Sequence, residues 1–248
     1  MTASATRSYR DSHRTKDKAE KYVAEYLDAS KPAGILWGLE QEILTEFFGK
    51  HDRAFKRALD FACGTGRVTG LVTQYVPDVV GIDISPEMLD LARTAVPSAK
   101  FVTGDLTRDS ALVPGPFDLV TAFRFFLEAD DDLRIEALQA IRKRLTHDGL
   151  LIANFHRNPM SIRGGYAVLS QRLRGKRMRT FTLRQATRML ESNGFAVDEV
   201  HGYMHLMYRG APRGPVVWRK RIDGWLRKRP FLRGVGQSFI LIARPRTS

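Results

Sequence analysis

The stretch Ala58-Leu59-Asp60-Phe61-Ala62-Cys63-Gly64-Thr65-Gly66-Arg67-Val68-Thr69-Gly70 decides the fold class of this 248-residue chain. An apolar run ends near an acidic residue, two glycines one residue apart follow, and then a helical pattern begins. Glycine serves where the backbone must turn with positive φ or come close to a ligand, and the N–H groups at a helix start attract anionic groups. The stretch predicts a strand, a tight turn and a helix that together bind a nucleotide-type cofactor. A glycine turn with a purely structural purpose is the alternative.

Apolar runs typical of strands alternate with helical patterns along the chain. Strands are expected at 56–62, 79–83, 100–105, 117–123, 150–155, 195–200 and 237–243, and helices at 16–27, 35–48, 85–94, 131–144 and 182–193. This alternation predicts an α/β fold with a doubly wound, mostly parallel sheet. Ligands of such sheets bind beyond the carboxyl ends of the strands.

We expect two parts in the chain. Residues 1–52 would form an N-terminal helical cap or lid over the cofactor loop, with a break between its two helices at 31–34. Residues 53–248 would form the α/β domain, with an insertion at about 156–181 and a basic amphipathic segment at about 213–233.

The basic residues of the chain gather in its last third. The whole chain has a formal net charge of +13, and residues 156–248 hold 20 Lys and Arg against 4 Asp and Glu. Such a segment suggests an anionic partner: a phosphate-bearing substrate, a membrane surface or a nucleic acid. A solvated basic face is the alternative.

Two tryptophans stand out within this basic region. Trp218, Ile222, Trp225 and Leu226 fall at helical spacing among lysines and arginines, a pattern typical of helices that lie in a membrane interface. We therefore expect peripheral attachment to an anionic membrane through this segment. The alternative is a helix that packs its apolar stripe on the sheet.

Cys63 is the only cysteine, so a disulfide within the chain and a CxxC zinc site are both excluded. We expect no metal. A reducing compartment fits this cysteine usage, and the N-terminus lacks the apolar core of a secretory signal. No stretch approaches the roughly 20 apolar residues of a membrane span. These features predict a cytoplasmic protein that could attach to the inner membrane face.

Three carboxylates fall at or near expected strand ends: Asp60, Asp83 and Asp105. The glycine spacing is not the dinucleotide fingerprint G-x-G-x-x-G, because Thr69 stands at its third glycine position. An acid at the end of the second strand can accept both hydroxyls of a ribose, and Asp105 could accept an adenine amino hydrogen. The set predicts a cofactor with a ribose, an amino group and few phosphates.

The segments 59–66, 81–88, 104–106 and 117–120 together resemble the class I S-adenosylmethionine-dependent methyltransferases. The resemblance covers roughly residues 55–155. It implies a Rossmann-like, seven-stranded sheet whose last strand is antiparallel, and S-adenosyl-L-methionine as cofactor. The family often has a glycine where Ala62 stands, which is a small departure.

The resemblance also implies roles for individual residues. Asp60 and the loop with Ala62, Cys63, Gly64 and Gly66 would hold the methionine end of the cofactor, and Asp83 would bind the ribose. The adenine would contact Ile84, Met88, Asp105 and Leu106, and Phe123 completes the expected cofactor set. Met88 could instead be a core residue, and Asp83 a strand-end cap.

Methyl transfer is a single displacement at a sulfonium methyl group, so the protein mainly aligns the reactants. Alignment can contribute roughly 7–11 kcal/mol, whereas a general base adds about 10²–10⁴-fold and is not obligatory. His156 is the candidate base because it follows the fifth expected strand, and Arg124, after the fourth, could hold an anionic acceptor. A structural role for His156, and a core role for the aromatic run around Arg124, are the alternatives.

The residues present in the sequence argue against two kinds of DNA methylation. Methylation of cytosine C5 needs a cysteine beyond the fourth strand, but Cys63 lies in the cofactor loop. The Asn/Asp-Pro-Pro-aromatic motif of DNA amino-methylation is absent at 122–125. We expect O-methylation of a small or lipid-linked acceptor, with N-methylation of a small amine or RNA methylation as alternatives. Nucleic acid is the less favoured partner. A non-catalytic nucleic-acid- or membrane-binding module on the same fold is the alternative of another class.

Overall fold

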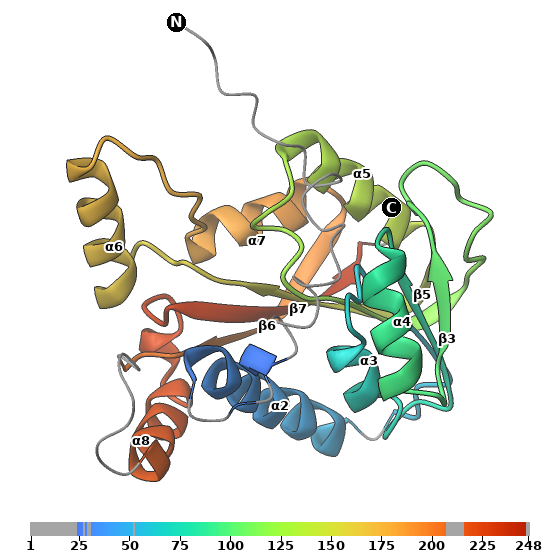
Figure 1. Cartoon of the computed structure of the whole chain (residues 1–248), viewed down its shortest axis with the longest axis horizontal. Coiled ribbons are helices and arrows are strands. Elements are labelled where there is room, and N and C mark those ends of the chain that lie inside the picture. Colours follow the sequence, from blue (N-terminus) through green and yellow to red (C-terminus); the bar gives the residue numbers. More distant parts are fainter. Residues whose placement is uncertain (1–23, 27, 29–30, 52, 207–215, 247–248) are drawn as a thin grey trace, which may run out of the picture.

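The computed structural model describes residues 24–26, 28, 31–51, 53–206 and 216–246. Strands and helices alternate through most of this range (Figure 1). The strands are β1 (Arg57–Phe61), β2 (Asp78–Asp83), β3 (Lys100–Thr103), β4 (Phe117–Ala122), β5 (Leu145–Phe155), β6 (Phe195–Tyr203) and β7 (Ser238–Pro245). The helices are α2 (Pro32–Lys50), α3 (Arg67–Val72), α4 (Pro86–Ala95), α5 (Asp131–Arg142), α6 (Ile162–Leu173), α7 (Leu183–Ser192), α8 (Val216–Arg227) and the short 3-10 helix η2 (Pro230–Leu232).

All seven strands form one sheet in the order β3-β2-β1-β4-β5-β7-β6. The neighbours from β3 to β5 pair in parallel, whereas β7 runs antiparallel to both β5 and β6. The predicted doubly wound sheet with an antiparallel last strand is therefore confirmed. The strand order reverses direction between β1 and β4, which is where ligands bind in such sheets.

Alternate residues of the strands bury opposite faces of the sheet. One apolar cluster packs α5 and α7 on the face that includes Leu59, Val120 and Leu151. The other packs α2 and α3 on the face that includes Leu119 and Ile152. Figure 1 shows α5 and α7 above the sheet and α2 below it. Both faces are covered, as parallel sheets require.

The helix starts predicted at residues 85 and 182 are confirmed, and a side-chain hydrogen bond caps each helix. The Ser85 side chain accepts from the Met88 N–H at 3.3 Å and so caps α4, whose first residue is Pro86. Thr182 and Gln185 form a reciprocal capping box at the start of α7. In each case the side chain satisfies an N–H group that the helix itself leaves without a partner.

Two predicted boundaries are wrong. The helix expected from residue 35 begins at Pro32, the first residue of α2, where its fixed φ and missing N–H are tolerated, so the break before this helix ends at Lys31. Strand β5 begins at Leu145 and not at Leu150. Its register with β4 shifts between the pairs Phe117–Leu145 and Leu119–Leu150, so residues 148–149 lie at an irregularity inside a longer strand.

Most of the first expected helix, 16–27, lies outside the described residues, as does the start of the basic segment at 213–215. Of the expected N-terminal cap, α2 packs its apolar residues on the sheet. The cap as a separate part stays a prediction. None of the helices in the described ranges is both long and apolar enough to cross a membrane.

Candidate cofactor and acceptor site

Three residues of the turn after β1 adopt the left-handed backbone conformation. Ala62, Gly64 and Gly66 have φ values of 55°, 56° and 77°, and Gly66 is the residue that caps α3. A side chain at φ > 0 is strained, by about 1–3 kcal/mol for a non-glycine residue. Ala62 therefore stands where the backbone favours glycine, which explains in physical terms why the family resemblance placed a glycine there.

Asp60 lies beneath this turn and not in an open space. Its carboxylate is buried and accepts the hydroxyls of Thr69 at 2.6 Å and Thr121 at 2.7 Å. Burial raises the pKa of Asp60 to about 6, against the opposing effect of the two hydroxyl donors. Asp60 thereby ties β1 to β4 and to α3, which fixes the base of the turn.

The thiol of Cys63 stays protonated at neutral pH. Burial, and then the carboxylates of Asp60 and Asp83, raise the pKa of this thiol well above its ordinary value. A protonated thiol is a poor nucleophile. The environment of Cys63 therefore agrees with the exclusion of cysteine-based methyl transfer.

A small pocket, with a cavity volume of about 40 Å³, opens at the carboxyl ends of β1, β2 and β3. Most of its wall is apolar, and two carboxylates stand in it. It is lined by Phe61, Ala62, Ile82, Asp83, Ile84, Gly104, Asp105, Leu106, Thr107, Phe125 and Leu133. A mostly apolar cleft with a few fixed polar groups is the usual form of a cofactor site.

The two carboxylates of the pocket are held by backbone donors. Asp83 accepts the N–H of Gly64 at 2.8 Å through one oxygen and that of Ser85 at 3.0 Å through the other. Asp105 accepts both the N–H and the hydroxyl of Thr107. Each oxygen has more than one lone pair, so both side chains can still accept hydrogen bonds from a ligand.

Five of the eleven predicted cofactor residues line this pocket: Ala62, Asp83, Ile84, Asp105 and Leu106. Met88 and Phe123 are buried in the protein, and Gly66 lines a second pocket with a cavity volume of about 400 Å³ between α2, α3 and α4. The sequence reasoning missed Phe125 and Leu133, which come from the segments after β4. Their apolar character was visible, but their place depends on how that loop folds back.

On the acceptor side, the backbone of Arg124 adopts a φ of 61° directly after β4. Its N–H donates to the side-chain oxygen of Asn154 at 2.6 Å, and Asn154 donates in turn to the buried carboxylate of Glu40 at 2.7 Å. Glu40 also accepts from Tyr203 and pairs with Arg67 at 3.1 Å. This buried network holds the strained loop in place and joins it to α2, α3 and β6.

His156 follows β5 directly and is 6% exposed. Neither ring nitrogen has a hydrogen-bond partner in the described part of the chain, and Nε2 lies 3.8 Å from a carboxylate oxygen of Glu128. Burial lowers the pKa of His156 to about 4, and the positive charges of Arg124 and Arg157 add to this effect against the opposing Glu128. The imidazole is therefore neutral at pH 7, and its low pKa makes it a weak base.

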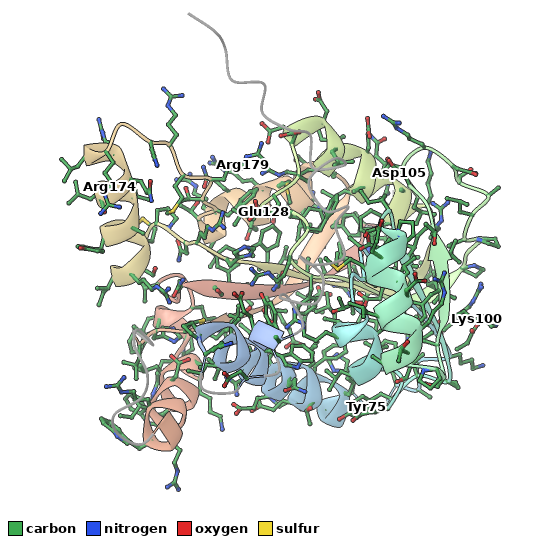
Figure 2. All side chains as sticks on the ribbon, viewed as in Figure 1. Tyr75, Lys100, Asp105, Glu128, Arg174 and Arg179 are labelled. Carbon is green, nitrogen blue, oxygen red and sulfur yellow. The ribbon has the colours of Figure 1, made fainter. Side chains whose placement is uncertain are left out.

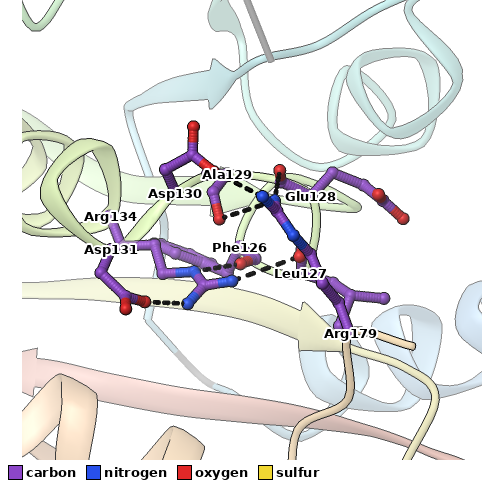
Figure 3. A network of polar contacts seen from close by, with 8 residues as sticks. All are labelled: Phe126, Leu127, Glu128, Ala129, Asp130, Asp131, Arg134 and Arg179. Atoms are coloured by element: carbon purple, nitrogen blue, oxygen red, sulfur yellow. Dashed lines mark hydrogen bonds and ion pairs between the residues drawn. The ribbon is translucent and has the colours of Figure 1, made fainter. Parts of the chain in front are cut away.

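The loop between Arg124 and α5 is fixed by two other arginines (Figure 3). Arg134 of α5 donates to the carbonyls of Phe126 at 2.6 Å and Leu127 at 3.2 Å. Arg179, from the predicted insertion, donates to the carbonyl of Glu128 and pairs with Asp130. Figure 2 shows Arg179 and Glu128 close together. The insertion thus helps to position the loop that carries Arg124 and Phe125.

The predicted site residues therefore fall into two neighbouring groups. The pocket lies over β3, β2 and β1, and Arg124 and His156 follow the next strands, β4 and β5. Phe125 lines the pocket and directly follows Arg124, so one loop borders both groups. In the part of the chain that the structure describes, no three His, Cys, Asp or Glu side chains gather as metal ligands.

Comparisons with known proteins agree with this arrangement. Residues 58–149 match the family model described as a methyltransferase domain. The magnesium-protoporphyrin O-methyltransferase of Rhodobacter capsulatus is 39% identical over 71 residues, which are 27% of this chain and 30% of that protein. The chain spans less than half the length of each curated relative it matches.

Solved structures match over most of the chain. A TehB-like SAM-dependent methyltransferase from Corynebacterium glutamicum has a TM-score of 0.60 at 18% identity, over 94% of this chain and all of that one. Magnesium protoporphyrin IX methyltransferase from Synechocystis, with bound SAH, has a TM-score of 0.58 at 17% identity, over 85% of this chain and 83% of that one. Residues 58–149 thus match the methyltransferase-domain model, and the chain shares the fold of these solved S-adenosylmethionine-dependent methyltransferases.

Proposed function

We propose that the protein transfers a methyl group from S-adenosylmethionine to an oxygen atom of a small or lipid-linked acceptor. The observation that carries the proposal is the pocket at the ends of β2 and β3, where Asp83 and Asp105 stand among apolar walls. Its donor set fits the cofactor. Asp83 would accept from ribose hydroxyls, Asp105 from the adenine amino group, and Ile84 and Leu106 would contact the adenine ring.

S-adenosylmethionine, when bound, supplies a methyl group on a positively charged sulfur. The protein then has to hold the acceptor oxygen in line and accommodate the proton it loses. In this proposal His156, which is neutral at pH 7 and a weak base with a pKa of about 4, accepts that proton. It stands at the end of β5, next to the strand that carries Arg124.

The local charge favours an oxygen acceptor over an amine. Arg124 and Arg157 both act on the His156 ring through their positive charge. Arg157 is ion-paired with Glu128 at 3.1 Å, so Arg124 is the cation that would stabilise a hydroxyl as it loses its proton and disfavour a protonated amine. The O-methyltransferase activity in the name of the Rhodobacter capsulatus relative supports the same preference.

A transfer assay with S-adenosylmethionine labelled in its methyl group tests the acceptor. Hydroxyl-bearing and amine-bearing compounds, and a total lipid extract, would be offered separately, and the products would be identified by mass. We expect label on oxygen. Label on nitrogen alone, with none on oxygen, would overturn the proposed acceptor.

A histidine variant tests the proposed base. His156→Gln should lower kcat by about 10²–10⁴-fold and leave the affinity for S-adenosylmethionine unchanged. His147→Gln is the matched control because His147 has an 84% exposed side chain. An unchanged kcat in His156→Gln would remove the base from the mechanism.

A further inference from the structure

Helix α8 turns two charged residues, Asp223 and Arg227, inward and its tryptophans outward. Asp223 is 1% exposed and accepts the N–H groups of Met204 at 2.9 Å and His205 at 2.6 Å. Arg227, one helical turn later, is buried and pairs with both carboxylate oxygens of Glu46 on α2, at 2.6 and 2.9 Å. The residues that attach α8 to the protein are therefore an ion-pairing acid and base.

The opposite side of α8 is apolar and exposed. Trp218 and Trp225 are 50% and 57% exposed, and at about 3.6 residues per turn they lie roughly opposite Asp223 and Arg227. Phe231, on η2 just beyond the helix, is 78% exposed. The expected alternative, a helix that packs these tryptophans on the sheet, therefore does not describe α8. Surface helices of globular proteins normally have the reverse arrangement.

Helix α6 has the same inverted arrangement. Its apolar side chains Ile162, Tyr166, Leu169 and Leu173 follow one helical stripe and are 81%, 61%, 57% and 80% exposed. Only Gly164 of the twelve residues is buried. Contiguous apolar patches of this kind are uncommon on proteins that have no partner there.

The segment before α6 and the segment after η2 are joined through the buried residue Asn158. Its side-chain nitrogen donates to the carbonyls of Gly234 and Gly236, each at 2.8 Å, in the segment between η2 and β7. Ser161 caps α6 and also donates to the Asn158 carbonyl. Figure 1 shows α6 and α8 at the same end of the molecule. The two apolar stripes can therefore meet one partner together.

The positive charge around both apolar stripes indicates an anionic partner. Arg172, Arg174, Lys176 and Arg177 are exposed at the end of α6, and Arg219, Arg221, Lys228, Arg229 and Arg233 are exposed around α8 and η2. Figure 2 shows Arg174 at the opposite end of the molecule from Lys100. Residues 156–190 contain no Asp or Glu. A second copy of the chain would bring like charges together, because a two-fold interface joins the same patch from both copies.

We propose that α6, α8 and η2 form one surface that binds an anionic phospholipid membrane. Aliphatic and tryptophan side chains enter the interface while the surrounding arginines and lysines meet the headgroups. Exposed aliphatic stripes favour lipid over nucleic acid, which binds through aromatic stacking and phosphate contacts. The inference is independent of the methyl-transfer chemistry, since membrane binding is measured without cofactor.

Co-sedimentation of the full chain with vesicles tests this surface. We expect binding to vesicles of equal parts phosphatidylcholine and phosphatidylglycerol, and little binding to phosphatidylcholine alone. The pairs Leu169→Gln with Leu173→Gln, and Trp218→Gln with Trp225→Gln, should each lower the partition coefficient at least about tenfold. Ile135→Gln on α5, where Ile135 is 43% exposed, is the matched control and should bind as the unchanged protein does.

Variants that remove single charges separate the electrostatic contribution to membrane binding from the contribution of the apolar side chains. Arg172→Gln and Arg174→Gln should each weaken binding about fivefold, and Lys100→Gln should have no effect. The substituted side chains are exposed, so circular dichroism should show an unchanged fold. Failure of the full chain to sediment, or equal binding by the α6 variant, would overturn the proposal. The proposal would also be overturned if the protein formed a dimer that the α6 substitutions dissociate. It would be overturned too if the protein bound an oligonucleotide and did not bind vesicles.

Discussion

His156 should make the protein lose stability on acidification. Its pKa is about 4 in the folded protein and about 6.5 in the unfolded chain. The unfolded chain therefore takes up the proton first as the pH falls. The stabilising contribution of neutral His156 is complete above pH 6.5 and is lost progressively between about pH 6.5 and 4.

The size of this loss follows from the two pKa values. At about 1.36 kcal/mol for each pKa unit, the full loss is about 3 kcal/mol, and about 2 kcal/mol of it has occurred by pH 5. Asp60 acts in the opposite direction, because burial raises its pKa to about 6 and its protonation favours the folded state. That effect is common to the protein and its His156 variants, so it cancels in the comparison between them.

Urea unfolding at pH 7.5 and at pH 5.0 measures the effect. Between these two values the unchanged protein should lose about 2 kcal/mol more of its free energy of unfolding than His156→Gln does. His147→Gln, which alters an exposed histidine, should follow the unchanged protein. Parallel pH curves for the protein and His156→Gln would refute the account of a buried, neutral imidazole.

Two further pairs of substitutions test the packing described. Glu40→Gln should lower the free energy of unfolding by about 2 kcal/mol, because the buried carboxylate accepts three charged or polar donors, whereas exposed Glu42→Gln should change it by less than about 0.5 kcal/mol. Gly164→Ala should destabilise by about 1–3 kcal/mol, because its Cβ would lie 1.8 Å from the carbonyl oxygen of Asn158. Gly224→Ala, also inside a helix but with no atom within 4 Å of the new Cβ, should stabilise by about 0.5–1 kcal/mol. Chemical unfolding measures all four, and equal effects within either pair would contradict the packing described.

Local patterns predicted the parts of the fold that depend on neighbouring residues. The glycine turn and the helix starts at Ser85 and Thr182 each depend on hydrogen bonds within a few residues. Asp83 and Asp105 share one pocket because parallel strands end at the same edge of the sheet. For these features the spacing of residues in the sequence is enough to predict their arrangement in the structure.

Other features depend on contacts between distant parts of the chain. The strained backbone of Arg124 is held by Asn154, 30 residues away, and Asn154 by Glu40, 114 residues away. The inward face of α8 is decided by Asp223 and Arg227, whose partners lie on other elements. Hydrophobic periodicity identified the stripe of α8 but not the side on which the helix attaches, and the helix α6 within the insertion was missed.

Isothermal titration calorimetry with S-adenosylmethionine tests the central claim most directly. We expect saturable heat at one site per chain. Asp83→Asn should weaken the affinity about tenfold or more through loss of a charged acceptor. Asp90→Asn is the matched control, because Asp90 is an exposed carboxylate on α4, and it should bind as the unchanged protein does. Absence of heat from the unchanged protein, or equal affinity in Asp83→Asn, would contradict the assigned cofactor site.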